Sequence, residues 1–130
     1  MAITLLDASL AGLAELILIG YMLVVTLVEA VVMLVFKFNP FGKCLLDAFL
    51  VNLASLGVGY LISSSYNITL GGDSYTSLLV AFIVTLIIEG LLLQLLNRKK
   101  SPKKVWQVNI LMNAITYAGI LVIFILSNAS

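Results

Sequence analysis

The sequence predicts an all-α integral membrane protein, a bundle of four transmembrane helices, and its composition is the first reason. Hydrophobic residues make up 62% of the 130 residues and charged residues only 10%. So little polar surface cannot cover a water-soluble globule of this size. A membrane-spanning helix needs about 20 mainly apolar residues. Four segments meet that length and together make one transmembrane domain within residues 1–130, at 12–36, 44–63, 77–96 and 105–127.

The first apolar stretch is longer than one span. It runs from Ile3 to Phe36, which at about 1.5 Å per residue exceeds a hydrocarbon core of roughly 30 Å. We therefore expect residues 1–11 to lie in the membrane interface. No Lys or Arg precedes Lys37, whereas a signal peptide begins with a basic region, so no cleavage is expected.

The positions of the basic residues predict the orientation of the spans. All seven fall between the first and second segments or between the third and fourth, at Lys37, Lys43, Arg98, Lys99, Lys100, Lys103 and Lys104. By the positive-inside rule both of these loops face the cytoplasm, and both termini are then extracytoplasmic. Pro40 and Pro102 interrupt helix propagation in the loops, which favours tight helical hairpins.

The segment between the two hairpins, residues 64–76, is expected to form an outer loop. It contains Asp73 and no Lys or Arg, as is usual on the extracytoplasmic side. Asn67 begins an Asn-Ile-Thr glycosylation sequon on that side. Patterns of three residues arise often by chance, so Asn67 is a candidate modification site in a eukaryotic membrane and nothing more.

The residue types that most catalytic and metal sites require are scarce. Cys44 is the single cysteine and the chain has no histidine, which excludes an intrachain disulfide and removes the commonest transition-metal ligand and general base. No phosphate-binding glycine loop, nucleophile elbow or nucleic-acid motif occurs. We therefore expect no cofactor and no nucleic-acid partner, and the identity of any metal stays open.

The polar residues predict a parallel repeat of two helical hairpins, residues 12–63 and residues 77–127. When the hairpins are aligned, Glu29 falls on Glu89 and, after one inserted residue, Asn52 falls on Asn113. Both hairpins run from outside to inside and back, so an axis along the membrane normal would relate them.

These four side chains are expected to lie in one layer. Glu29 and Glu89 stand eight and nine residues before a basic loop, and Asn52 and Asn113 each stand nine residues after a lysine. At about 1.5 Å per residue, all four lie some 12 to 14 Å from the loops. One turn farther outward on the same helical faces come four hydroxyl residues, Thr26, Ser55, Thr85 and Thr116.

Access to this layer is expected from the cytoplasmic side. Asn109, four residues before Asn113, extends the polar positions toward the basic loops. In the opposite direction the next turn is apolar and would close the outer side, at Met22, Gly59, Phe82 and Ile120.

Carboxyl groups in the hydrocarbon region need partners, because each costs on the order of 2.5 to 3.5 kcal/mol to place there. Asn can donate to a carboxylate and accept from a protonated carboxyl, so it suits either state of Glu29 and Glu89. Two carboxyls in one low-dielectric layer do not both ionise without a cation. The layer is therefore expected to share protons or to bind something positive.

The leading hypothesis is a small membrane protein for ion transport or ion-coupled transport. Its ion- or substrate-binding residues would be Glu29, Glu89, Asn52, Asn113, Thr26, Thr85, Ser55, Thr116 and Asn109. The alternative is a non-catalytic subunit or scaffold that packs against a larger membrane partner, with the Glu/Asn layer serving only in interhelical hydrogen bonding. A lipid-acting enzyme that uses the paired carboxyls as acid and base is a third hypothesis, although no nucleophile accompanies them. In each case membrane lipid surrounds the chain, and a homo-oligomer is compatible with all three.

Overall fold

The computed structural model describes residues 2–66 and 75–128, without the side chains of residues 2–11, 14, 65 and 66. Four helices occupy these ranges: α1 (Ala2–Val35), α2 (Phe41–Tyr66), α3 (Tyr75–Leu96) and α4 (Pro102–Asn128). Each contains a segment long and apolar enough to cross a membrane. The prediction of an all-helical membrane protein with four candidate spans is confirmed. Asn67 and Asp73 of the expected outer loop lie outside the described residues.

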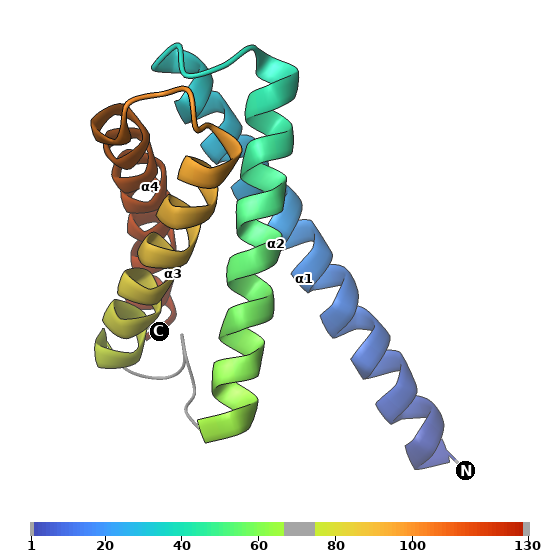
Figure 1. Ribbon diagram of the computed structural model, residues 1–130. Coiled ribbons are helices and arrows are strands. Elements are labelled where there is room, and N and C mark those ends of the chain that lie inside the picture. The colour runs from blue at the N-terminus through green and yellow to red at the C-terminus, as the bar shows by residue number, and fades with distance from the viewer. Residues whose placement is uncertain (1, 67–74, 129–130) are drawn as a thin grey trace.

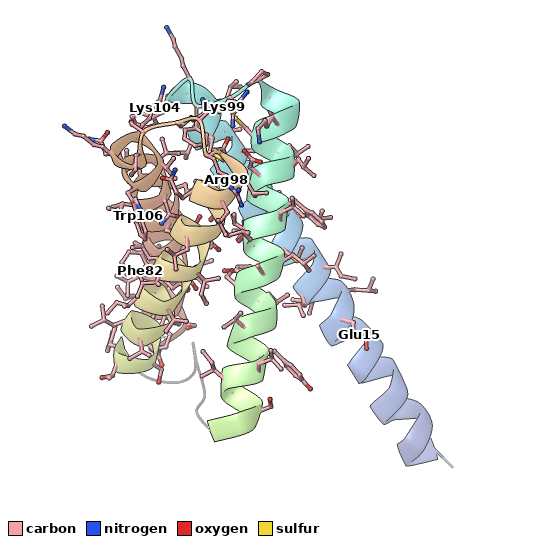
Figure 2. All side chains as sticks on the ribbon, in the orientation of Figure 1. Glu15, Phe82, Arg98, Lys99, Lys104 and Trp106 are labelled. Atoms are coloured by element: carbon pink, nitrogen blue, oxygen red, sulfur yellow. The ribbon has the colours of Figure 1, made fainter. Side chains whose placement is uncertain are left out.

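The helices form a ring of neighbours. α1 packs on α2, α2 on α3 and α3 on α4, and α4 closes the ring by packing on α1. Figure 1 shows the α1–α2 and α3–α4 connections at the same end of the molecule, with the two chain termini toward the other end. We call these the loop end and the terminal end. Figure 2 labels Arg98, Lys99 and Lys104 at the loop end.

Helix α1 differs from the expected first span because it is continuous from Ala2. Its 34 residues measure about 51 Å at about 1.5 Å per residue, well over one hydrocarbon thickness. Figure 1 shows its N-terminal part leaning away from the other helices. Leu16, Ile17 and Ile19 on this part are more than half exposed, so in a bilayer they contact lipid or another protein.

The buried apolar core lies in the half of the bundle nearest the loop end. Its fully buried members come from all four helices and the first loop, and include Met33, Phe38, Ala48, Leu93 and Met112. Toward the terminal end the helices expose most of their large apolar side chains. The bundle is therefore tightly packed beside the loops and spread open at the other end.

The turn after α1 ends that helix with a left-handed residue. Lys37 has φ of 49°, and its N–H donates to the Leu34 carbonyl at 2.9 Å while the Phe38 N–H donates to the Met33 carbonyl at 2.9 Å. This pair of bonds is the Schellman arrangement, which usually has glycine in the left-handed position. Phe38 is 1% exposed, so the turn directs its ring into the core.

A buried polar cluster joins the two loops. Asp47, 1% exposed, accepts hydrogen bonds from Asn39 at 3.0 Å, from Asn97 at 3.0 Å and from the Lys43 ammonium at 2.8 Å. Asn39 also donates to the Asn97 side-chain carbonyl at 2.8 Å, a link between residues 58 positions apart. We call Asn39, Lys43, Asp47 and Asn97 the loop-end cluster. Because its bonds connect the first loop and α2 to the end of α3, it fixes how the helices meet.

Candidate functional site

Glu29 lies in the C-terminal part of α1, six residues before the helix ends at Val35, and is 1% exposed. Its Oε2 accepts a short hydrogen bond from the side-chain amide of Asn52 on α2. Its Oε1 accepts from the hydroxyl of Thr116 on α4 at 3.3 Å. The carboxyl therefore joins both helices that flank α1 in the ring.

Glu89 on α3 is 0% exposed and has a corresponding set of partners. Its Oε2 accepts from the side-chain amide of Asn113 on α4 at 2.9 Å, and its Oε1 accepts from the hydroxyl of Ser55 on α2 at 2.7 Å. Each carboxyl thus has an amide donor from the helix that follows it in the chain and a hydroxyl donor from the other helix pair.

Helices α2 and α4 each hold both carboxyls through residues three positions apart. On α2 these are Asn52 and Ser55, and on α4 they are Asn113 and Thr116. Residues at i and i+3 share one helical face, so each carboxyl accepts one bond from the asparagine turn and one from the hydroxyl turn next to it. All four donors are neutral, and the only ion pair among the described residues, Lys43 with Asp47, lies in the loop-end cluster.

The asparagines are themselves held in place. The Asn52 amide also donates to the Ala48 carbonyl at 2.9 Å, and the Asn113 amide to the Asn109 backbone carbonyl at 3.1 Å. Asn109 donates to the Leu86 carbonyl of α3 at 2.8 Å. The Asn113 Oδ1 atom is buried and has no hydrogen-bond partner within the described part of the chain.

Seven of the nine residues proposed from the sequence belong to this network, and two do not. Thr85 pairs with the Tyr117 hydroxyl at 3.1 Å, and no hydrogen bond from it to either carboxyl is found in the described part of the chain. Thr26 is 3% exposed, and its hydroxyl has no partner among the described residues. The structure therefore brings the Glu, Asn and two outer hydroxyl side chains together, and their binding role stays a prediction.

A cavity of about 430 Å³ reaches both carboxyls, and it contradicts the expected direction of access. Met22 and Ile120, expected to close the outer side, line it, and it continues past Gly59 toward Tyr60 and Ser63 at the terminal end. Asn109, expected to open the loop side, is 0% exposed within the packed half. The prediction of access from the basic loops is wrong, because the helices spread at the opposite end.

Three tyrosines line this cavity, Tyr21, Tyr60 and Tyr117, and the sequence reasoning did not include them in the site. Tyr117 is positioned by its bond to Thr85 and by an edge contact with Phe82, the ring centroids being 5.0 Å apart. Phe82 was expected to close the outer side, and it instead supports a cavity wall. Tyr117 lies four residues after Asn113 and so shares its helical face, a signal that was present in the sequence.

The atoms that could coordinate a ligand at this site are carboxylate, amide and hydroxyl oxygens. Oxygens of this kind suit protons and hard cations rather than soft metals. No protein-family model matches this chain, and neither a curated protein nor a solved structure was found to match it. The function is therefore argued from the geometry of the site.

Proposed function

We propose that this protein is a small ion-coupled membrane transporter in which Glu29 and Glu89 bind protons or a cation. One observation carries the proposal: two fully buried carboxyls, whose hydrogen-bond donors among the described residues are all neutral, face one open cavity. A carboxyl inside the hydrocarbon region is costly, and two neighbouring ones need a proton or a positive ligand to neutralise them. The cavity gives such a ligand a route to them.

The proposal includes a structural relation between the two helix pairs. Glu29 with Asn52 and Glu89 with Asn113 have matching donors, and each accepts one hydroxyl from the opposite pair. This exchange of partners supports a parallel repeat about an axis along the membrane normal. It would place two similar half-sites side by side, so that occupation of one carboxyl changes the charge felt by the other.

The orientation is part of the same proposal. With the basic loops in the cytoplasm, the cavity beside Tyr60 and Ser63 opens toward the extracytoplasmic side. Transport then needs a second state in which the packed loop half opens. Reporter fusions at the C-terminus and near Ser101 would check the orientation, and a cytoplasmic C-terminus would reverse it.

A scaffold that packs against a larger partner is the second candidate, and one observation favours it. Leu16, Ile17 and Ile19 on the N-terminal part of α1 are more than half exposed, which would suit a partner helix. In that case the carboxyls serve only in interhelical hydrogen bonds.

Replacing both glutamates by glutamine separates the two candidates. In Glu29→Gln, the amide oxygen can accept from Asn52 as the carboxyl does, and the new NH₂ group donates to the Thr116 hydroxyl, which then accepts instead of donating. The same exchange works at Glu89 with Asn113 and Ser55. We expect the double variant to fold normally, while its proton or cation flux falls at least tenfold. The flux is measured in proteoliposomes with an entrapped pH- or ion-sensitive dye.

Glu15→Gln is the matched control. It removes one carboxylate from an exposed position on the leaning part of α1 (Figure 2), and should leave the flux unchanged. Replacing Glu29 and Glu89 by leucine should weaken packing by roughly 1 to 3 kcal/mol under either candidate, since it leaves buried donors unsatisfied. An intact, pH-responsive flux in the double glutamine variant would contradict the proposal that Glu29 and Glu89 bind the transported proton or cation.

A further inference from the structure

The size of the cavity indicates a ligand larger than a proton or a metal ion. Its volume of about 430 Å³ compares with about 30 Å³ for one water. It falls within the roughly 300 to 1,000 Å³ typical of sites for small organic molecules. A single inorganic ion at the carboxyls would fill only a small part of this volume.

The walls of the cavity are mainly aliphatic and aromatic. All four helices contribute apolar side chains, among them Leu18, Leu56 and Leu78. Tyr21, Tyr60 and Tyr117 add three aromatic rings. Aromatic faces attract organic cations, especially where water is excluded. Such walls suit a ligand with an apolar body.

The inner end of the cavity is rich in acceptors. Glu29 and Glu89 offer carboxyl oxygens, and the buried Asn113 Oδ1 has no partner within the described residues. Among the described residues, no Lys or Arg lines the cavity. An anion would be repelled there, and a neutral apolar molecule would leave the carboxyl charge without compensation.

We infer that the cavity binds an organic monocation, with its positive group at Glu29 and Glu89 and its apolar body against the tyrosine-lined walls. This inference rests on the proposed function, because it assigns a substrate class to the same carboxyls. The cation and protons neutralise the same groups, so each excludes the other. Binding of the cation releases protons, and inward movement of one is tied to outward movement of the other.

The probe is benzyltrimethylammonium, with its uncharged isostere neopentylbenzene as competitor. Equilibrium dialysis of the full-length protein in mild detergent measures the bound fraction. We expect saturable binding to the wild type, weakened at least tenfold as the pH falls from about 8 to about 5, because protons compete with the cation for the carboxyls. Neopentylbenzene should not displace the probe, and the unbuffered protein should release protons on binding.

Two sets of variants locate the contacts. Glu29→Gln with Glu89→Gln should abolish binding, whereas Glu15→Gln should not change it. Tyr117→Leu should weaken binding roughly threefold to thirtyfold by removing a ring. Tyr117→Phe keeps the ring and should stay near the wild type, which separates the aromatic contribution from the hydroxyl bond to Thr85.

Equal binding by the wild type and the double glutamine variant would overturn the inference, as would displacement by neopentylbenzene. Absence of saturable probe binding, together with a glutamate-dependent proton or sodium flux, would reject the organic cation and leave the proposed function standing. Absence of both binding and flux would reject both.

Discussion

The loop end and the middle of the bundle both bury carboxyl groups, but they neutralise them differently. At the loop end Asp47 accepts from Lys43 at 2.8 Å and from two asparagine amides. In the middle, Glu29 and Glu89 accept only from neutral amides and hydroxyls. The first carboxyl lies in the packed half, and the other two border a cavity.

Under the proposed function, this difference separates a carboxyl with a structural role from two that bind protons or a cation. Asp47 has its counter-charge within the protein, so its charge needs nothing from outside. The two glutamates have no counter-charge among their partners and need a proton or a ligand. Burial is the same at all three positions, at 0 or 1% exposure, and so burial alone does not distinguish them.

The largest expected effect comes from breaking the loop-end cluster. Asp47→Leu leaves the amides of Asn39 and Asn97 without their acceptor inside the protein, and should lower the free energy of unfolding by about 2 to 4 kcal/mol. Unfolding in mixed detergent micelles measures this loss. Glu15→Leu, at an exposed position, is the control and should change the stability by less than about 0.5 kcal/mol.

The flux of the Asp47→Leu protein tests the comparison itself. Under conditions where the variant is folded, each molecule should transport at the wild-type rate, because Asp47 is not part of the cavity. A folded variant without flux would show that the division between a structural and a functional carboxyl is wrong.

A smaller effect is expected where the packed half meets the site. A Cβ atom added at Gly90 would lie 2.5 Å from the Trp106 ring and 2.9 Å from the Asn109 amide. Gly90→Ala should therefore destabilise the protein by about 1 to 3 kcal/mol through overpacking. At Gly57 an added Cβ would meet no described atom within 4 Å outside its own stretch of helix backbone, so Gly57→Ala is the matched control and should cause no loss. Equal stabilities for the two variants would contradict the close contact between α3 and α4.

The smallest effect is expected at Thr26, whose buried hydroxyl has no partner within the described residues. Thr26→Val keeps the shape and removes the unsatisfied group, so the free energy of unfolding should stay constant or rise by up to about 1 kcal/mol. If Thr26 is a site residue, the flux should fall about twofold to fivefold. A loss of stability would instead mean that the hydroxyl is hydrogen-bonded and serves in packing.

The sequence predicted the four helices and the carboxyl network because both follow from local information. Apolar length marks the spans, and distance from a basic loop gives the depth of Glu29 and Asn52. The loop-end cluster was missed because Asp47 and Asn97 stand beside the basic loops, where polar residues are ordinary, so no pattern showed that the tertiary fold joins them. The direction of the cavity was missed because, apart from Glu15, α1 carries only apolar side chains near Leu16 and Ile17, so no periodicity shows which face packs.

Trp106 gives the molecule a built-in optical probe. It is the only tryptophan in the chain, and its ring lies against Gly90, the residue after Glu89, and beside Asn109. Asn109 in turn contacts Asn113, a donor to Glu89. Indole emission depends on nearby charge and polarity, so the intrinsic fluorescence of the unlabelled protein should change when the glutamate layer gains or loses a proton or a cation.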